Sequence, residues 1–234
     1  MPEMYEIYEK HLSQYHELIC AEDYQGNLWP ALQKAIDWRN LAVIEGGVGT
    51  GRLTSLYIEQ VASSVCCDRS QPMLDFAEKL HSGYKNKLRF VRANNEDLPA
   101  LDGRFDLFIE GWSFGHSISD CANMGEVDSM TSLLVHNAAK NIVPSGLVII
   151  VETLGTNVDS PTIPNKNLGR FYTALEQQHG FEATAIRTDY RFESNAEASR
   201  IMGFFFGETM SQSVLERKSQ IIPEWTGIWT NAVS

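Results

Sequence analysis

A short apolar run that leads directly into a glycine-rich turn is the feature of this sequence that most restricts its fold. Leu41–Glu45 is followed by Gly46-Gly47-Val48-Gly49-Thr50-Gly51, and residues 53–61 after the turn can form a helix. A strand, a turn and a helix in this order are typical of one unit of a parallel α/β sheet. Glycine lets backbone amides approach a ligand, and a turn that opens a helix points N–H groups at it. The turn is therefore a candidate binding site.

The alternation of strand and helix patterns continues along the chain. Further strands are predicted at 61–67, 88–92, 105–110 and 147–152. Helical patterns separate them, one of them capped by Ser70, and Asp106 is predicted to be a structural acid at the start of its strand. Strands that alternate with helices predict a largely parallel sheet covered on both faces.

The two ends of the chain have patterns of their own. Apolar residues at every third or fourth position predict an N-terminal helix with one packing stripe, formed by Met4, Tyr8, Leu12, Tyr15 and Ile19. A second helix is predicted at 28–38, a strand at 183–192, and a helix opened by the capping box Ser194-x-x-Glu197. We expect a single domain, with a helical cap at 1–39, a core at 40–193, a helical lid inserted at 194–223 and a final strand at 224–234.

Composition limits the classes of function. Acidic residues outnumber basic ones 30 to 19, and the net charge of −11 argues against nucleic acid, whose phosphates need Lys and Arg. The chain has no signal-peptide pattern, no stretch near 18 consecutive apolar residues and no C-x-x-C pair, so we expect a cytoplasmic protein that does not enter membranes. No motif indicates a metal or an oligomeric state.

An acid at the end of the second predicted strand strengthens the interpretation of the turn. Asp68 stands about 20 residues after the glycines, where a carboxylate can accept hydrogen bonds from a ribose diol; a helix cap is the alternative. Arg52 follows Gly51, so the turn departs from the G-x-G-x-x-G fingerprint of dinucleotide-binding proteins. A nicotinamide cofactor therefore fits less well.

Five motifs, in order and spacing, resemble those of class I S-adenosylmethionine-dependent methyltransferases. They are Glu45-x-Gly47-x-Gly49-x-Gly51, Asp68-x-Ser70-x-x-Met73-Leu74, Asn94-Asn95-Glu96-Asp97-Leu98-Pro99, Phe105-Asp106-Leu107 and Pro144-x-Gly146. The resemblance implies a Rossmann-like α/β fold with a mostly parallel seven-stranded sheet and helices on both faces. It also implies S-adenosylmethionine as cofactor, S-adenosylhomocysteine as product, and in-line transfer of the methyl group to an acceptor.

The resemblance implies a set of cofactor residues as well. Glu45 is expected to hold the turn and the methionine amino group, Asp68 the ribose hydroxyls, and Asn94 the adenine edge. Asn94 stands where the family usually has aspartate, and its amide oxygen can still accept from an exocyclic amine. The predicted set is Glu45, Gly46, Gly47, Gly49, Asp68, Arg69, Asn94, Asn95, Glu110 and Gly111.

The acceptor is expected beyond the fourth strand, at Glu110-Gly111-Trp112-Ser113-Phe114-Gly115-His116. This segment does not resemble the motif with two prolines that methyltransferases of nucleobase or amide nitrogens carry. His116 is the candidate general base or substrate-positioning residue, because imidazole titrates near neutral pH; a structural role is the alternative. The predicted substrate residues are Trp112, Tyr15, Tyr24 and Phe205, within an aromatic wall that also includes Phe114, Phe204, Phe206 and Trp225.

These observations predict a methyltransferase that acts on a small molecule. A protein-modifying methyltransferase, a cofactor-binding module without transfer activity and a dehydrogenase stay open as alternatives. The sequence also leaves open whether O, N, C or S of the acceptor is methylated.

Overall fold

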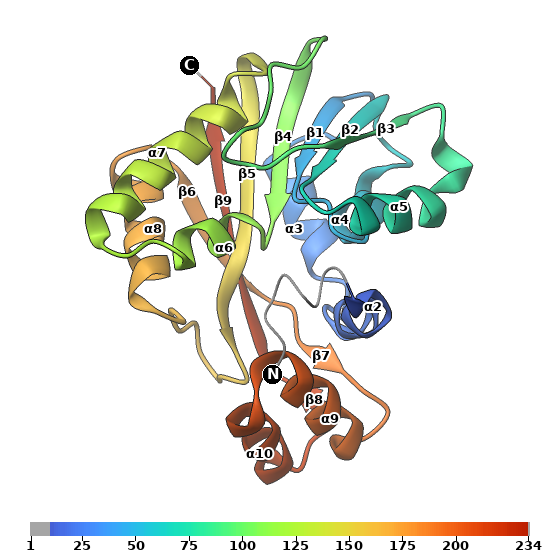
Figure 1. The fold of residues 1–234 in the computed structure, drawn as a ribbon, viewed down its shortest axis with the longest axis vertical. Coiled ribbons are helices and arrows are strands. Elements are labelled where there is room, and N and C mark those ends of the chain that lie inside the picture. The colour runs from blue at the N-terminus through green and yellow to red at the C-terminus, as the bar shows by residue number, and fades with distance from the viewer. Residues whose placement is uncertain (1–9, 234) are drawn as a thin grey trace.

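The computed structural model describes residues 10–233, and a seven-stranded sheet forms their centre (Figure 1). The strands of this sheet are β1 (Ala42–Gly46), β2 (Ser63–Asp68), β3 (Leu88–Arg92), β4 (Phe105–Gly111), β5 (Ile142–Thr156), β6 (Glu182–Arg187) and β9 (Glu224–Ala232). Their order is β3-β2-β1-β4-β5-β9-β6; β9 pairs antiparallel with both β5 and β6, and the other pairs are parallel. The predicted mostly parallel, Rossmann-like sheet is confirmed.

Helices cover both faces of the sheet, as expected. They are α3 (Leu28–Ala35), α4 (Arg52–Tyr57) and α5 (Gln71–Leu80), with the short η1 (Ser82–Tyr84), and α6 (Phe114–Ser119), α7 (Met124–Ala139) and α8 (Lys166–Gln177). Figure 1 shows the first group on one side of β1–β5 and the second group on the other. Val43 packs in one cluster with α3 and α4, while the next residue, Ile44, packs with α6 and α7. This alternation follows from the two-residue period of a strand.

Local sequence signals explain where several helices begin. The Ser70 hydroxyl accepts a hydrogen bond from Met73 N, so Ser70 caps α5 as predicted. The Ser194 hydroxyl does the same for Glu197 N at α9 (Asn195–Phe206). The Glu197 carboxylate reaches back to Glu193 N, at 2.6 Å, instead of to Ser194 N. Asp106 accepts from Ala42 N at 2.8 Å and so joins β4 to β1, which confirms its structural role.

The predicted strand at 183–192 is divided in the structure. β6 ends at Arg187, and β7 (Tyr190–Arg191) pairs instead with β8 (Ile221–Ile222) in a separate two-stranded sheet. Between them, Thr188 donates its N–H to Glu224 O, and the Asp189 carboxylate accepts from Glu224 N and pairs with Arg187. These bonds turn the chain away from the sheet, toward α9 and α10 (Glu208–Arg217). The alternating pattern alone did not show this break.

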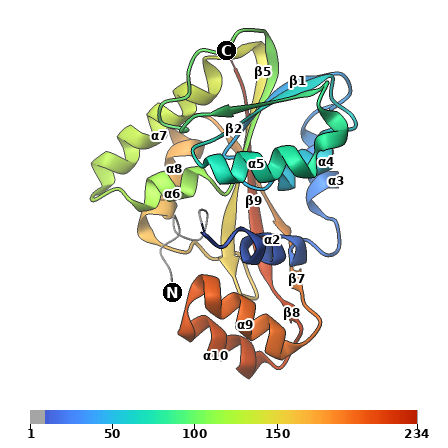
Figure 2. The same ribbon diagram turned by 45° about the vertical axis from the view of Figure 1, so that its right-hand side comes forward.

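The N-terminal helix α2 (Leu12–Ala21) lies between the sheet and the α9–α10 pair (Figure 2). Its buried Leu18 packs in one cluster with Ile201 and Phe205 of α9. Met4 and Tyr8 of the predicted stripe lie outside the described residues. Within residues 10–233, no helix has both the length and the apolar character that crossing a membrane requires.

Candidate functional site

The glycine turn lies at the carboxyl end of β1, where the strand order reverses between β1 and β4. Gly47, Gly49 and Gly51 have φ angles of +62°, +54° and +89°, a region that residues with a Cβ rarely adopt. Space is limiting too, because a Cβ on Gly47 would lie 2.2 Å from the Ser113 Cβ, and one on Gly51 2.6 Å from His81 Nε2. The turn therefore needs glycine at both of these positions for packing as well as for conformation.

A cavity of about 70 Å³ opens beside this turn, and we call it the smaller cavity. Asp68, at the end of β2, is 9% exposed and lines it. The Asp68 carboxylate accepts from Gly49 N at 2.9 Å and from Ser70 N at 2.8 Å, so it is held in place from two sides. The residues that line this cavity are Tyr15, Gly47, Gly49, Asp68, Arg69, Met73, Ala93, Asn94, Asn95, Glu96, Gly111, Trp112, Ser113, His116 and Ser117.

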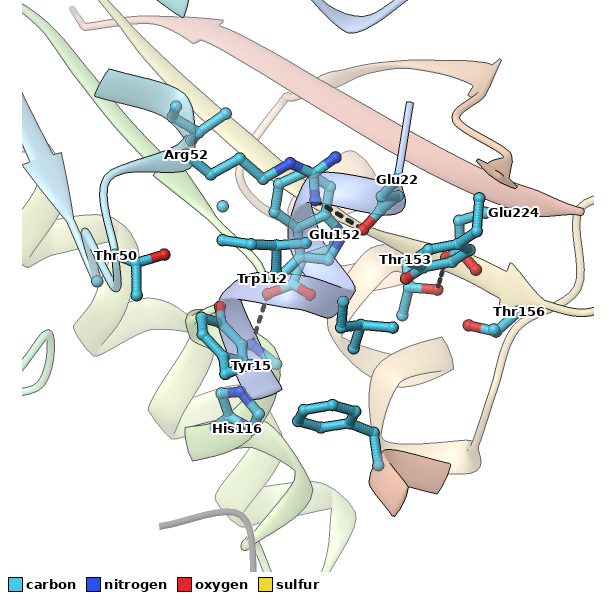
Figure 3. Close-up of a pocket in the computed structure, with 18 of the residues that line it drawn as sticks. Tyr15, Glu22, Thr50, Arg52, Trp112, His116, Glu152, Thr153, Thr156 and Glu224 are labelled. Atoms are coloured by element: carbon cyan, nitrogen blue, oxygen red, sulfur yellow. Dashed lines mark hydrogen bonds and ion pairs between the residues drawn. The ribbon is translucent and has the colours of Figure 1, made fainter. Parts of the chain in front are cut away.

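A second cavity of about 230 Å³, the larger cavity, extends from the turn toward β9 and α9 (Figure 3). Tyr15, Gly47, Gly111, Trp112 and His116 line both cavities, so these residues form their junction. Other residues that line the larger cavity include Glu22, Glu45, Thr50, Arg52, Glu152, Thr153, Thr156, Tyr190, Phe205, Phe206 and Glu224. The sheet thus presents two adjoining compartments at one end.

The junction has an unusual backbone. Trp112 follows β4 with a φ of +55°, a strained conformation for an aromatic residue, and its N–H donates to Val151 O at 2.7 Å. The Arg52 guanidinium lies 4.0 Å from the centroid of the Trp112 ring. His116, on α6, is half-buried, and burial lowers the pKa of its imidazole. A neutral imidazole therefore faces both cavities at neutral pH.

Helix α2 covers both cavities. The Tyr15 hydroxyl lies over the turn, 3.5 Å from where a Cβ on Gly49 would be, and its ring makes an edge contact with Phe205. His16 Nδ1 lies 3.2 Å from Thr50 Oγ1. After the helix, Glu22 pairs with Arg52 at 2.7 Å. The N-terminal helix is thus connected to the glycine turn at one side and to α9 at the other.

Glu45 lines the larger cavity beneath the turn and is almost fully buried. Its carboxylate accepts from Thr54 Oγ1 at 2.6 Å and from the Tyr57 hydroxyl at 2.5 Å. Burial nevertheless raises the pKa of Glu45 to about 7. These bonds join the Glu45 carboxylate to α4, the helix that follows the turn.

Most of the predicted cofactor residues come together at the smaller cavity. Gly46 instead packs below it, where a Cβ would lie 2.8 Å from Asn95 Oδ1. Glu110 is fully buried outside both linings, and its carboxylate accepts from Ser113 N, Ser113 Oγ and Phe114 N at the start of α6. Glu110 therefore caps α6 and fixes the segment that carries His116.

The predicted aromatic wall is assembled only in part. Tyr15, Trp112, Phe205 and Phe206 line the larger cavity, whereas Phe114 is buried in the core below α6. Tyr24 lines neither cavity, and Arg191 lies over its ring at 4.9 Å. Phe204 packs on Phe205, and Trp225 faces Arg187. The part of the wall that forms consists of aromatic residues of α2 and α9 together with Trp112, which follows β4.

Sequence reasoning identified Glu45 but missed the other charged residues of the larger cavity. These are Glu22, Arg52, Glu152 and Glu224. Arg52 directly follows Gly51, and Glu152 stands at the carboxyl side of the fifth predicted strand, so their positions gave a usable signal. Glu22 and Glu224 gave none, because tertiary packing alone brings them to the site.

Both a family model and solved structures match this chain. A family model described as a methyltransferase domain matches residues 43–134. No curated protein matches the chain significantly. Among solved structures, the YcgJ protein from Bacillus subtilis is similar at a TM-score of 0.60 and 12% identity, over 90% of this chain and 99% of that one.

Two further solved structures are similar to this chain. A SAM-dependent methyltransferase from Thiobacillus denitrificans, in complex with S-adenosyl-L-homocysteine, matches at a TM-score of 0.57 and 13% identity over 99% of each chain. A protein from Pyrococcus horikoshii, described as a candidate RNA methyltransferase, matches at 0.54 and 12% identity over 89% of this chain and 83% of that one. At such low identity these likenesses show the fold alone.

Proposed function

We propose that the chain is a class I, S-adenosylmethionine-dependent methyltransferase that methylates a small molecule, in line with the methyltransferase-domain model that matches residues 43–134. The observation that carries this proposal is the junction of two cavities, a smaller one beside the glycine turn and a larger one under α2 and α9. The residues that line both cavities would hold a methyl donor across the junction, and that donor would supply the methyl group to an acceptor in the larger cavity. In-line transfer then requires only that the acceptor be held against it.

The smaller cavity fits the nucleoside part of S-adenosylmethionine. The Asp68 carboxylate is already oriented by two backbone amides and takes the ribose hydroxyls. Asn94, Asn95 and Arg69 line the same cavity and surround the adenine. Gly49 leaves space above the turn that a side chain would fill. Glu45 and Gly47, at the start of the larger cavity, meet the methionine part.

The enclosure of the larger cavity favours a small acceptor over a macromolecule. Tyr15 and Leu18 of α2 and Phe205 and Phe206 of α9 line it, so the segment at 194–223 and the N-terminal cap act as a lid. A protein or RNA acceptor needs an open groove, and the charge of −11 further disfavours RNA. His116, at the junction, either takes a proton from the methyl acceptor or positions that molecule for methyl transfer.

Replacing Asp68 by alanine tests the cofactor site. We expect the variant to lose about 1.5–3 kcal/mol of binding free energy for S-adenosylhomocysteine, roughly 10- to 150-fold in affinity, because the ribose diol loses a charged acceptor. Isothermal titration calorimetry measures the change. Asp106→Ala is the matched control, since Asp106 also accepts a backbone amide but lies at the start of β4, away from both cavities.

The outcomes separate the competing functions. Wild-type protein that binds NAD tightly and S-adenosylhomocysteine poorly would indicate a dehydrogenase and overturn the proposal. Equal affinity of Asp68→Ala and wild type would remove Asp68 from the site. Cofactor binding without methyl transfer to any member of a broad set of small-molecule acceptors would favour a non-catalytic module.

A further inference from the structure

Two buried carboxyl groups in the larger cavity each have an oxygen without a partner. The side chain of Glu22 is 5% exposed and Glu224 is 2% exposed. Among the described residues, Glu22 Oε1 and Glu224 Oε2 have no hydrogen-bond partner, and both residues line the cavity. A buried carboxylate oxygen without a partner is costly, so its presence calls for a ligand that donates to it.

The other oxygen of each group is already used. Glu22 Oε2 accepts from Arg52 Nη1 at 2.7 Å, and Glu224 Oε1 accepts from Thr153 Oγ1 at 2.8 Å. The Tyr190 and Thr156 hydroxyls also interact with Glu22 and Glu224, respectively, but neither completes a hydrogen bond to the remaining oxygen. Both carboxyl groups are therefore fixed in orientation by protein groups from different elements, each with one oxygen left over.

The two groups lie close enough to interact electrostatically. Burial of Glu224 raises its pKa to about 8, and the charge of Glu22 is the second largest cause of this increase. Figure 3 shows Glu22 and Glu224 next to each other, with His116 apart from them beside Tyr15. Two like charges in one buried place repel each other, and a cation between them removes that repulsion.

The charge count of the larger cavity supports a positively charged acceptor. Carboxyl groups line it at Glu22, Glu45, Glu152 and Glu224. The Arg52 guanidinium pairs with Glu22, and its Nη2 also has no hydrogen-bond partner among the described residues. The methionine part of S-adenosylmethionine has an ammonium, a carboxylate and a sulfonium, one net positive charge. If all four carboxyl groups were ionised, they would exceed the cations by two, and burial raises the pKa values of Glu45 and Glu224 to about 7 and about 8, so a bound cation would favour their ionised forms. An acceptor with a positive charge offsets part of this excess.

On the basis of the proposed function, we propose that the acceptor carries a protonated amine, which binds between Glu22 and Glu224. The ammonium group donates to Glu22 Oε1 and Glu224 Oε2. The rings of Tyr190 and Phe205, which line the same cavity, attract the cation further. Glu22 and Glu224 thus determine the substrate class.

The test uses probes that share a skeleton and differ in charge. Full-length protein saturated with S-adenosylhomocysteine is titrated with 2-phenylethylamine, 2-phenylethanol and 3-phenylpropanoate, and then with butylamine, 1-butanol and pentanoate. We expect the amine of each series to bind at least about 10-fold more tightly than its neutral and anionic counterparts, the scale of a hydrogen bond to a charged group.

Isosteric variants then assign the selectivity to the two residues. Glu22→Gln and Glu224→Gln should each weaken amine binding by about 10- to 100-fold, while alcohol binding and S-adenosylhomocysteine affinity change less than about 2-fold. Glu216→Gln is the control, because Glu216 is an exposed carboxyl group outside both cavities, and it should change nothing.

The possible failures are distinguishable. Protein that does not bind S-adenosylhomocysteine refutes the proposed function. Protein that binds it but prefers the alcohol or the acid, or binds none of the probes, refutes only the amine assignment. If folded Glu224→Gln loses affinity for S-adenosylhomocysteine, then Glu22 and Glu224 bind the cofactor. This outcome also refutes the amine assignment. A melting curve shows whether each variant folds. If a variant does not fold, the preference of the wild-type protein among the probes still tests the amine assignment.

Discussion

Gly49→Val is expected to reduce S-adenosylhomocysteine affinity by about 100-fold or more, about 2.7 kcal/mol. Gly49 has a φ of +54°, which a β-branched residue strongly disfavours. It also lines the smaller cavity, with the Tyr15 hydroxyl 3.5 Å from the position of a Cβ. The valine methyl groups would therefore occupy the space between the turn and α2 that the cofactor needs. Calorimetry with S-adenosylhomocysteine measures the loss.

A matched glycine separates blocked binding from backbone strain. Gly180 has a φ of +71°, and the nearest atom to a Cβ there is 4.0 Å away, outside both cavities. Gly180→Val should lose about 1–2 kcal/mol of stability, like Gly49→Val, and keep its cofactor affinity. If Gly49→Val binds as tightly as Gly180→Val, the turn is structural and the cofactor lies elsewhere.

The parts of the site that sequence predicted are those fixed by local chemistry. Glycines that follow an apolar run, an acid that ends the next strand and a serine before a helix each carry their meaning within a few residues. Asp68 illustrates this, because a strand end in a parallel sheet faces the ligand edge whatever lies around it. The order of these units along the chain then determines most of the sheet.

The parts that sequence did not predict depend on burial and distant packing. Glu110 occupies a strand end, like Asp68, yet its side chain turns inward and caps α6, a choice that position alone does not reveal. Tyr24 is an aromatic residue of the kind that often lines pockets, but its ring packs against Arg191. Glu22 and Glu224 come from opposite ends of the chain and meet only because β9 inserts into the sheet between β5 and β6.

His116→Ala is expected to lower turnover by about 10²- to 10⁴-fold if the imidazole takes a proton from the acceptor. His116 lines both cavities, so it lies where the sulfonium and the acceptor meet, while the cofactor is held mainly by other residues. Affinity for S-adenosylhomocysteine should therefore stay near that of the wild type. His136→Ala, a change at an exposed histidine on α7, controls for a general effect of losing an imidazole.

The pH profile of kcat/KM tests the same role by a second measurement. Burial lowers the pKa of His116 below its ordinary value of about 6.5, so the base is neutral and competent at pH 7. Activity should fall as pH drops through that lowered pKa, and this acid limb should disappear in His116→Ala. A variant that keeps its turnover but needs more acceptor would show that His116 positions the substrate instead. In a complex with S-adenosylhomocysteine, an imidazole more than about 8 Å from the sulfur and turned away from the cavity would contradict both roles, because proton transfer needs hydrogen-bond reach, directly or through one water.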